Sequence, residues 1–341
     1  MRLRFTSFVC LAASVCLLTF YAPESAFAQK VVPPDFKVEL LYSVPDIEHP
    51  SVVTCDDDGN LFVGEDPMDM RGPTSKEFDR VLFITFGPDG KPMRKTVFCD
   101  NLAAVFGLVW HNDALYVMHA PHFSMFKDTD GDGVADIRKD LATGFGPPAG
   151  VYGFNDHIVT GTRLGVDGLI YVSVGDKGVP KAVGSDGSSI TLEGGGVIRM
   201  RPDGSRLEIV SSGTRNHLDV AMDSLDNIFT YDNTDDGLGW WTRFTHHVTT
   251  GYYGYPYDYH PHPNRHLPRI SEHGGGSPVG AACYRESAWP ATYIGSPFFC
   301  EWGKQKVQRF KLKKKGISFE AEMEDFMIPD GSGEPFRPLD V

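Results

Sequence analysis

One short pattern recurs along most of the chain, and its spacing limits the folds that the chain can adopt. Each copy is an apolar stretch, a turn rich in Asp, Asn and Gly, and a second strand that ends in small or aromatic residues. Equivalent positions of the second strand, Leu61, Leu115, Ile170 and Ile228, are 54, 55 and 58 residues apart. A period of roughly 50 residues that contains only short strands indicates the blades of a β-propeller, because one blade cannot bury both faces of its sheet.

Other fold classes fit the repeat less well. No copy carries the apolar periodicity of a helical solenoid, and 37 Gly and 24 Pro are too many helix breakers for a coiled coil. A β-sandwich would explain the strands but not their period. With 341 residues the chain is long enough to bury a substantial core.

The number of copies predicts an all-β, six-bladed propeller whose last blade is truncated in this chain. Five copies precede residue 303, if a looser one that begins at Val279 is counted. The ending, Phe336–Val341, resembles the start of a sixth copy and stops before its turn. The strand Phe36–Tyr42 is expected to supply the outer strand that closes the ring. Residues 29–341 would then form the propeller, and the chain would be a fragment unless the ring closes in another way.

The N-terminus has the pattern of an export signal over residues 1–28. Arg2 and Arg4 precede an apolar run, and Ala26–Ala28 is an A-x-A cleavage site, so the mature chain is expected to begin at Gln29. A membrane anchor is the alternative, less favoured because polar residues interrupt the run and a proline follows it. We therefore expect an exported protein, periplasmic, secreted or at the cell surface, with no transmembrane segment after cleavage.

The cysteines and the net charge limit the cofactors and partners that the chain can have. Export would permit disulfides among Cys55, Cys99, Cys283 and Cys300, but the sequence does not choose among the three pairings or exclude free thiols. No C-x-x-C-H motif occurs, so this chain carries no covalently attached haem. The net charge of −13 argues against nucleic acid as the main partner.

The most specific motif is an acidic loop that predicts a calcium site. Asp128, Asp130, Asp132 and Asp136 occupy positions 1, 3, 5 and 9 of the loop, with glycines that permit a tight turn. These carboxylates, the carbonyl of Val134 and water would supply the roughly six to eight oxygens that Ca²⁺ prefers. The loop is not an EF-hand, since position 12 is a lysine, and a metal-free hairpin turn is the alternative. We expect a structural ion, because the loop would join outer strands of a blade.

Two stretches carry residues suited to catalysis or cofactor binding. His157 precedes Asp176 by 19 residues, and both would border the axial opening of a propeller. A histidine beside a carboxylate can accept a proton from a substrate hydroxyl. Arg215 and Asn216 enter the fourth inner strand, where a guanidinium could bind carboxylate or quinone oxygens. The structural alternatives are a common Gly-Asp turn and a solvated loop arginine.

The stretch from Tyr231 to His262 combines acidic residues with many aromatic ones. Seven Trp and Tyr side chains lie between Trp240 and Tyr259. Aromatics this dense among polar residues suit stacking on a sugar or a flat cofactor, and they could equally be packing. The histidines in and after this stretch lack a ligand spacing typical of zinc sites, so a transition metal is not expected.

Several of these stretches resemble the soluble quinoprotein glucose/sorbosone dehydrogenases, in the same order along the chain. The resemblance is carried by Asp156-His157, Arg163–Asp176, Gly195–Gly204, Gly213–Asn216 and Tyr253–Pro256. That family folds as a six-bladed propeller that binds pyrroloquinoline quinone (PQQ) and Ca²⁺ at its funnel. The resemblance implies a general base and its acidic partner, His157 and Asp176, and four cofactor-binding residues, Arg215, Asn216, Lys304 and Arg337.

Nearly all of the chain after the signal also resembles the membrane-bound dehydrogenase propellers of planctomycete-type bacteria. This resemblance is carried by Tyr116–Phe145, with its acidic loop, and by Phe336–Val341. Those propellers are often followed by helical repeats and a cytochrome c segment. The resemblance therefore implies a cytochrome c as the electron acceptor.

The chain departs from the sugar dehydrogenases at two places. It has Tyr231–Asp236 where their Gly-Pro turn holds the catalytic Ca²⁺, and Val179 where they have an arginine. The sequence thus predicts an exported, PQQ-dependent oxidoreductase that acts on a sugar or other alcohol. Two alternatives remain: a non-catalytic carbohydrate-binding propeller, and a calcium-dependent lactonase that would use Glu65, Asp232 and Asn233 as metal ligands.

Overall fold

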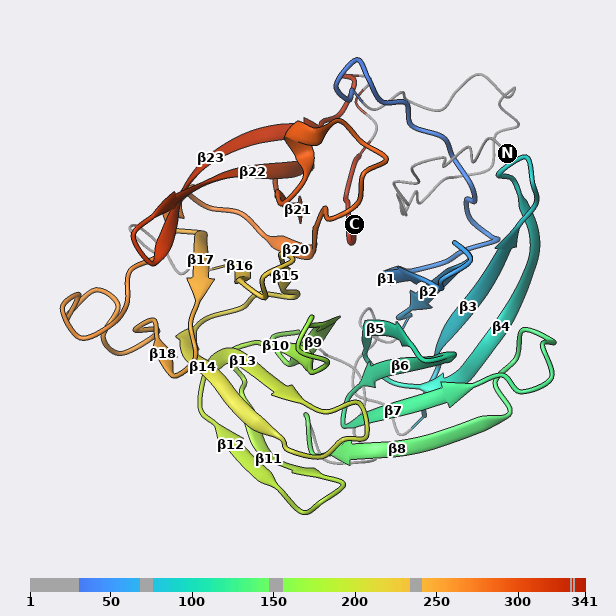
Figure 1. The fold of residues 1–341 in the computed structure, drawn as a ribbon, viewed down its shortest axis with the longest axis horizontal. Helices are drawn as coiled ribbons and strands as arrows, with labels where there is room; N and C mark the ends of the chain where they lie inside the picture. Colours follow the sequence, from blue (N-terminus) through green and yellow to red (C-terminus); the bar gives the residue numbers. More distant parts are fainter. Residues whose placement is uncertain (1–30, 68–75, 147–155, 234–240, 332, 334) are drawn as a thin grey trace.

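The repeats fold into five antiparallel sheets that follow one another around a central axis (Figure 1). The computed structural model describes residues 31–67, 76–146, 156–233, 241–331, 333 and 335–341. The propeller class is confirmed. The prediction of six blades is wrong, because these residues form five sheets. The expected export signal lies outside the described residues.

Three sheets are each built from one stretch of the chain, with their strands in chain order from the axis outward. Sheet 1 contains β1 (Pro50–Cys55), β2 (Leu61–Glu65), β3 (Asp79–Phe86) and β4 (Pro92–Leu102). Sheet 4 contains β15 (Ala221–Met222), β16 (Ile228–Asp232), β17 (Arg243–His247) and β19 (Ser271–Glu272). Sheet 5 contains β20 (Pro278–Cys283), β21 (Pro297–Glu301), β22 (Lys306–Lys315) and β23 (Ser318–Met327), with one 3₁₀ turn, η1 (Ala291–Tyr293).

Two sheets gain strands from elsewhere in the chain. Sheet 2 contains β5 (Val105–His111), β6 (Ala114–His119), β7 (His122–Lys127) and β8 (Ile137–Thr143), extended by β11 (Val179–Gly184) and β12 (Ser189–Leu192) from the third repeat. Sheet 3 contains β9 (Val159–Leu164), β10 (Ile170–Val174), β13 (Gly195–Met200) and β14 (Glu208–Thr214), to which β18 (Gly251–Tyr252) adds in parallel. These exchanges join neighbouring repeats by backbone hydrogen bonds.

The residues that revealed the repeat occupy equivalent places in the fold. Leu61, Ile170 and Ile228 begin second strands, and Leu115 is the second residue of β6. All four side chains are buried in the clusters that fill the space between sheets. The acidic turn before each strand also has a physical reason. In the turns of sheets 1 and 4, an Asp carboxylate accepts two backbone N–H groups of its own turn.

Inner strands approach each other closely at the axis. The N–H of Gly161 donates to the carbonyl of Leu218, and that of Gly280 to the carbonyl of Leu339, both at 2.8 Å. A Cβ at either glycine would lie 2.5 Å from the same carbonyl oxygen. Only glycine fits at these two positions without a shift of the neighbouring backbone.

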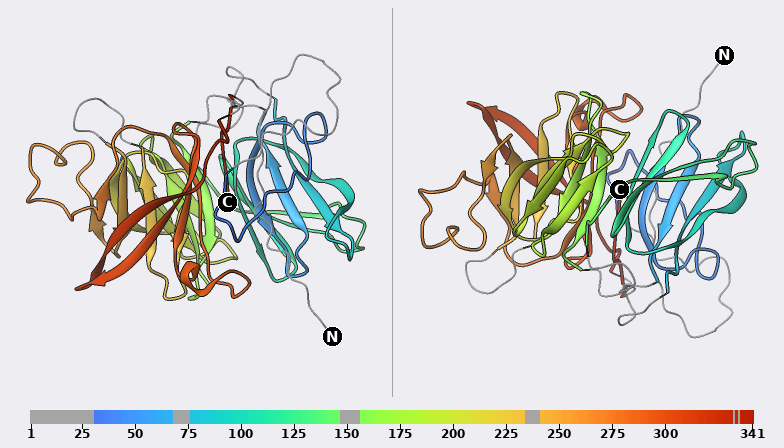
Figure 2. Two further views of the ribbon diagram at one scale, coloured as in Figure 1. Left: turned by 90° about the horizontal axis from the view of Figure 1, so that it is seen from above. Right: turned by 90° about the horizontal axis from the view of Figure 1, so that it is seen from below.

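The space between sheets 5 and 1 holds two segments that are not strands of either sheet. Val31 forms a β-bridge with Ile328, and Phe36 packs edge-on against Trp289 and Phe326. The expected outer strand from Phe36 onward is therefore an irregular segment against sheet 5. The second segment, residues 336–341, runs near the axis, as two views show (Figures 1 and 2). We refer to it as the C-terminal segment.

The last two strands of sheet 5 form a charged hairpin. β22 pairs with β23 at nine aligned positions, including Lys311 opposite Glu322 and Lys313 opposite Glu320. Lys315, the last residue of β22, forms an ion pair with Glu320 at 2.6 Å. β23 is the edge strand of its sheet.

The four cysteines are free thiols. Burial raises the pKa of the Cys283 thiol to about 12, so this side chain is a neutral packing group at ordinary pH. In the part of the chain that the structure describes, no helix is long and apolar enough to cross a membrane.

Candidate functional site

The candidate site lies at the mouth of the propeller where inner strands begin and second strands end. In an antiparallel pair the start of one strand lies beside the end of the next, so these strand ends gather at one mouth. The second strands β2, β16 and β21 end on Glu65, Asp232 and Glu301. In sheet 3 the acid, Asp176, comes two residues after β10. Four sheets thus place an acidic side chain at this mouth.

In sheets 1, 4 and 5 the acid binds the backbone that leads into the inner strand. Glu65 Oε1 accepts the N–H of Glu48 at 2.5 Å, and Asp232 Oδ2 accepts the N–H of Arg215 at 3.0 Å. Glu301 Oε1 accepts the N–H of Ser277. These three acids are at most 2% exposed. Each therefore fixes an entry loop and is not open to a ligand.

In sheet 3 the acid binds a side chain. The imidazole of His157, two residues before β9, lies 2.5 Å from Asp176 Oδ1 through its Nδ1. The backbone fixes both residues: Lys177 N–H donates to the His157 carbonyl at 3.1 Å, and Gly175 N–H donates to the Ile158 carbonyl at 2.9 Å. The two side chains are 22% and 24% exposed. This pair combines a fixed geometry with access from outside.

The surroundings keep Asp176 ionised. Burial raises the pKa of its carboxyl, but the hydrogen bond and charge of His157, together with the Arg215 guanidinium, outweigh burial and hold this pKa below its ordinary value. An ionised Asp176 accepts the Nδ1–H of His157, so in the neutral imidazole the free lone pair is on Nε2. The pair is then arranged as a base, with one nitrogen held and the other able to take a proton.

Arg215 and Asn216 lie beside this pair. The guanidinium of Arg215 donates from Nη1 to the carbonyl of Asn233 at 3.2 Å and acts electrostatically on Asp176. The carboxamide of Asn216 is buried, and its Oδ1 lies 2.7 Å from where a Cβ on Gly175 would be. Asn216 Oδ1 has no hydrogen-bond partner within the described residues. Consecutive repeats thus bring together an imidazole, a guanidinium and a carboxamide at one mouth.

The other two predicted cofactor residues belong to the neighbourhood of sheet 5. Lys304 follows β21 and donates from Nζ to the carbonyl of His273 at 2.8 Å. Arg337 places its guanidinium 3.9 Å from the ring centroid of Trp302 and donates to that residue's carbonyl at 3.1 Å. These contacts put both cations at the strand ends of sheet 5, while Arg215 belongs to the junction of sheets 3 and 4.

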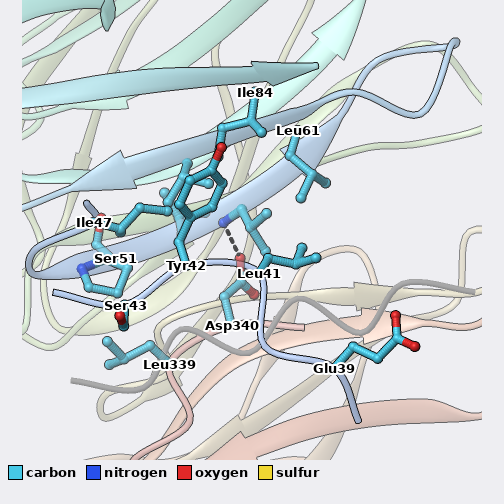
Figure 3. A pocket seen from close by; sticks show the side chains of 14 residues that line it. Glu39, Leu41, Tyr42, Ser43, Ile47, Ser51, Leu61, Ile84, Leu339 and Asp340 are labelled. Atoms are coloured by element: carbon cyan, nitrogen blue, oxygen red, sulfur yellow. Dashed lines mark hydrogen bonds between the residues drawn. The ribbon is translucent and has the colours of Figure 1, made fainter. Parts of the chain in front are cut away.

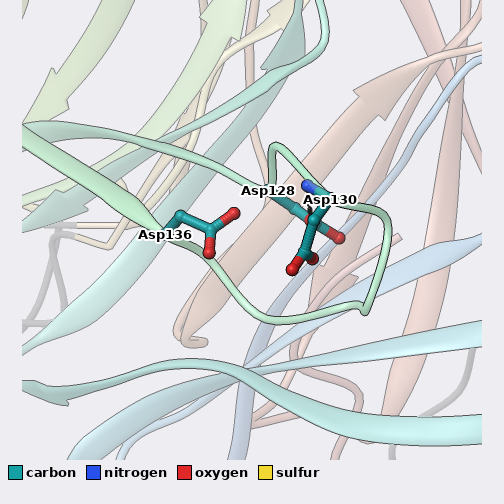
Figure 4. Close-up of side chains that lie close together, drawn as sticks. All are labelled: Asp128, Asp130 and Asp136. Carbon is teal, nitrogen blue, oxygen red and sulfur yellow. Dashed lines mark hydrogen bonds between the residues drawn. The ribbon is translucent and has the colours of Figure 1, made fainter.

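The acidic loop joins β7 to β8, and three of its carboxylates converge (Figure 4). Ligand oxygens of Asp128, Asp130 and Asp136 all lie within 4.8 Å of one another. Asp132 is not in this group, and its Oδ1 accepts the N–H of Val134 at 2.9 Å. Hydrogen bonds from the backbone and hydroxyl of Thr129 lower the pKa of Asp136.

The same loop fastens sheet 2 to sheet 1. The N–H of Ala135 donates to the carbonyl of Phe98 in β4 at 2.8 Å, and Thr96 Oγ1 donates to the carbonyl of Gly133 at 2.5 Å. The loop therefore lies between outer strands of neighbouring sheets, away from the mouth that carries His157.

Part of the aromatic stretch is used for packing. Tyr231 is buried in the core of sheets 4 and 5, and Tyr253 is buried with its hydroxyl on the carbonyl of His246 at 2.7 Å. Tyr259 covers the guanidinium of Arg243 at 4.0 Å. These three rings are not available to stack on a ligand, which fits the packing alternative for them, whereas Trp241 and Tyr257 of the same stretch are 42% and 68% exposed.

Some predicted residues cannot be placed. The acidic residues of 234–237 and Trp240 lie outside the described residues.

The metal ligands suggested for a lactonase do not converge. Glu65 receives hydrogen bonds from Glu48 N–H and Arg80 Nε, and Asp232 is paired with Arg243. Among the described residues, the one group of acidic, histidine or cysteine side chains close enough to share an ion is in the acidic loop. The structure gives the lactonase alternative no support.

Comparison with known proteins places the chain in a family. A family model described as "Domain of unknown function (DUF7133)" matches residues 22–341. The chain belongs to this family. No curated protein matches it significantly.

Solved structures share the fold at low sequence identity. One is the PQQ-bound form of an aldose sugar dehydrogenase from Streptomyces coelicolor, with 16% identity, a TM-score of 0.57, and 82% of this chain and 81% of the other covered. A second is the holo form of the PQQ domain of a pyranose dehydrogenase from Coprinopsis cinerea. It has 14% identity and a TM-score of 0.62, and the match covers 92% of this chain and 91% of the other. A third is the calcium structure of a Trichoderma reesei protein of Carbohydrate-Active Enzymes Family AA12. It has 10% identity and a TM-score of 0.61, and the match covers 92% of this chain and 92% of the other. At these identities the likeness establishes the fold, whereas a planctomycete-type origin and a membrane-bound state stay predictions.

Two groups that support the site were missed by the sequence reasoning. Asp232 and Arg243 form a fully buried ion pair with an oxygen–nitrogen distance of 2.6 Å, directly behind the Arg215 backbone. His217 is also buried, between Ser173 Oγ at 2.6 Å and Thr214 Oγ1 at 3.0 Å. Burial lowers the pKa of His217 to about 4, so this imidazole is a neutral packing group. No local sequence signal marks either group, because Arg243 and Ser173 lie on other strands than the residues that they contact.

Proposed function

We propose that the protein is a quinoprotein-like oxidoreductase that oxidises a hydroxyl group of a sugar or other alcohol at the mouth that carries His157. The observation that carries this proposal is the His157–Asp176 pair, partly exposed and held beside Arg215 and Asn216. The names of two solved structures with the same fold, an aldose sugar dehydrogenase and a pyranose dehydrogenase, support the same chemistry.

The residues present fit PQQ, an anionic cofactor rich in oxygen. Arg215 offers a planar guanidinium for carboxylate or quinone oxygens, and Lys304 offers an ammonium group. The buried carboxamide of Asn216 can donate from its nitrogen, while its unpartnered Oδ1 can accept from a hydroxyl group. Arg337 would bind the cofactor only from its stacked position on Trp302.

The chain's own residues would act on the substrate hydroxyl. Bound PQQ would supply the acceptor for two electrons. Asp176 keeps the proton of His157 on Nδ1, so Nε2 can remove the hydroxyl proton as the carbon–hydrogen bond is oxidised. Arg215 and Asn216 would orient the reactants beside this base. The Asp232–Arg243 pair fixes the Arg215 backbone and so keeps that guanidinium in place.

We also propose that the acidic loop binds a structural Ca²⁺ through Asp128, Asp130 and Asp136. Binding to the folded state alone would stabilise the protein by about 2.7 kcal/mol when free Ca²⁺ is 100 times its dissociation constant. Thermal unfolding with and without a chelator measures this, and Asp130→Asn should abolish the difference. An unchanged melting temperature on chelation of the wild type would refute the calcium site.

Export and a c-type cytochrome as electron acceptor complete the proposal, and both come from the sequence. N-terminal sequencing of the secreted or periplasmic protein tests the first, with Gln29 as the expected first residue.

Quinone titration and dye reduction test the main proposal. PQQ binding is followed by absorbance, and reduction of an artificial dye is measured over a panel of sugars and alcohols. His157→Ala should retain PQQ binding and lose turnover. His111→Ala, at the opposite mouth between β5 and β6, is the matched control and should behave like the wild type. Absence of both PQQ binding and quinone-dependent turnover would overturn the proposal, and glycan binding that survives His157→Ala would then indicate the carbohydrate-binding alternative.

A further inference from the structure

A second charged cluster lies at the axis, apart from the His157 mouth. Arg163, from β9, donates through Nη2 to Asp219 Oδ2 at 2.5 Å and to Asp340 Oδ1 at 3.4 Å. Its Nε also donates to the carbonyl of Ala281 in β20 at 3.2 Å. Both carboxylates are buried, and the guanidinium is largely so. One guanidinium therefore serves two carboxylates in a dry environment.

The cluster connects every sheet except sheet 2. Asp219 Oδ2 accepts the N–H of Ala281 in sheet 5 at 3.0 Å, and Asp219 itself precedes β15 of sheet 4. Asp340 belongs to the C-terminal segment, and its Oδ2 accepts the N–H of Val53 in β1 at 2.8 Å, shown by the dashed line in Figure 3. Asp340 thus attaches the C-terminal segment to sheet 1, across the space between sheets 5 and 1.

The two acidic positions are equivalent in the fold and in sequence. Leu218-Asp219 and Leu339-Asp340 are each followed by valine. The carbonyls of Leu218 and Leu339 each accept the N–H of an inner-strand glycine at 2.8 Å. The C-terminal segment therefore docks on sheet 5 as the entry to sheet 4 docks on sheet 3. Equivalent docking is what brings both carboxylates to the same guanidinium.

The charge count in this cluster is unbalanced. With both carboxylates ionised the cluster carries a net negative charge, and an uncompensated buried charge is unfavourable. Burial raises the pKa of both Asp219 and Asp340, against the attraction of Arg163. The other titratable group that faces the cluster is the Cys300 thiol of β21, whose pKa burial raises well above its ordinary value, so it stays neutral.

We propose that Arg163, Asp219 and Asp340 form a buried proton-binding site that fastens the C-terminal segment to sheet 1 while one proton is bound, and loosens it when the proton leaves. In the closed state one carboxyl is protonated and the other is paired with Arg163. Loss of the proton leaves two carboxylates on one guanidinium, and Asp340 can relieve this by leaving the cluster for water. The proposal is independent of the proposed function.

The direction of the pH effect follows from linkage. The closed state binds a proton more tightly than the open state, whose carboxyls have ordinary pKa values of about 4. Opening of the C-terminal segment should therefore increase by up to about tenfold per pH unit as the pH rises above about 4, until the closed state also loses the proton. The same step would expose the apolar pocket between residues 39–47 and sheet 1, which Leu339 and Asp340 help to line (Figure 3).

Hydrogen exchange of the Val53 amide in the intact protein tests the proposal, because this N–H is bound by Asp340 Oδ2. Exchange is measured from pH 5 to pH 8, corrected for the intrinsic rate, and referred to the amide of Met125 in sheet 2. The wild type should lose protection at Val53 as the pH rises, by up to about tenfold per pH unit. A corrected profile that does not change over this range would overturn the proposal without any variant.

Charge-neutral variants sharpen the test. Asp340→Asn keeps an oxygen acceptor for Val53 but leaves one carboxylate for Arg163, so the pH dependence should disappear. Asp219→Asn should have the same effect and serves if the first variant does not fold. Asp35→Asn removes one exposed carboxylate and should retain the wild-type profile. A wild-type slope in either cluster variant would contradict the proton site.

Discussion

Sheet 3 and the other acid-bearing sheets use the same strand end in different ways. In sheets 1, 4 and 5 the acid is at most 2% exposed, and it binds a backbone N–H. In sheet 3 the acid is displaced by two residues toward the mouth, is 24% exposed, and binds an imidazole. In a repeated architecture, a shift of the acid by two residues past the end of the second strand is thus enough to turn a structural acid into one that can orient a base. The comparison indicates that substitutions in sheet 3 test function and that substitutions in sheets 1, 4 and 5 test stability.

The largest expected effect is on turnover. His157→Ala and Asp176→Asn should each reduce dye-linked oxidation about 10²–10⁴-fold, because the first removes the proposed base and the second no longer fixes its tautomer. Both variants should keep the wild-type free energy of unfolding to within about 1 kcal/mol, since the pair is partly exposed. Steady-state kinetics and denaturant titration measure the two quantities. A loss of several kcal/mol in Asp176→Asn would make this acid structural, like those of the other sheets.

At the ion pair behind the Arg215 backbone we expect the reverse, a large loss of stability on substitution. Arg243→Ala should cost about 3–5 kcal/mol of unfolding free energy, because it leaves the buried carboxylate of Asp232 without its guanidinium. Urea denaturation measures the cost. Arg138→Ala, which removes a largely exposed ion pair with Asp140, is the control and should cost no more than about 1 kcal/mol. Equal costs in the two variants would break the distinction between buried and exposed pairs.

The turn that displaces Asp176 should tolerate little change. A Cβ at Gly175 would lie 2.5 Å from the carbonyl carbon of His157 and 2.7 Å from Asn216 Oδ1. Gly175→Ala should therefore cost about 1–3 kcal/mol through displaced backbone and weaken PQQ binding at the same time. Thermal unfolding and quinone titration measure the two effects. Gly168→Ala, where no atom lies within 4 Å of the added methyl, should leave PQQ binding unchanged and lose only stability through its positive φ.

The smallest expected effect is on turnover at low pH. The pKa of Asp176 is lowered in the folded protein, so its contribution is present above the ordinary carboxyl range and is lost as the pH falls through the lowered value. Turnover should therefore be insensitive to Asp176 protonation at pH 5–8 and should fall only below pH 4. NMR titration of the Asp176 carboxyl carbon tests this directly. A midpoint above 4 would show that burial outweighs the pairing with His157.

The sequence predicted those parts of the molecule that depend on local patterns. The spacing of Leu61, Leu115, Ile170 and Ile228 identified the second strands, because burial of a strand leaves a period in the chain. The number of sheets was predicted wrongly, because the ending Phe336–Val341 has the residues of an inner strand but docks as a single segment. Residues that share a local motif need not share the partners that complete a sheet.

The same limit applies to the candidate site. The proximity of His157, Asp176 and Arg215 was expected from repeat topology, since entry loops and second-strand ends meet at one mouth. The sequence could not decide between packing and ligand stacking for Tyr253 and Tyr259, because a dense aromatic stretch gives no sign of the buried Arg243 beneath it. An ion pair between residues far apart in the chain leaves no pattern in the sequence around either residue.

The lysine–glutamate pairs along β22 and β23 have a consequence for solubility. An edge strand with free backbone groups can recruit the edge of another molecule and start a fibril, and a row of charges makes such an approach unfavourable. Replacement of these lysines and glutamates by threonine would leave the hairpin's hydrogen bonds intact while removing that barrier, so the altered protein would fold and then self-associate.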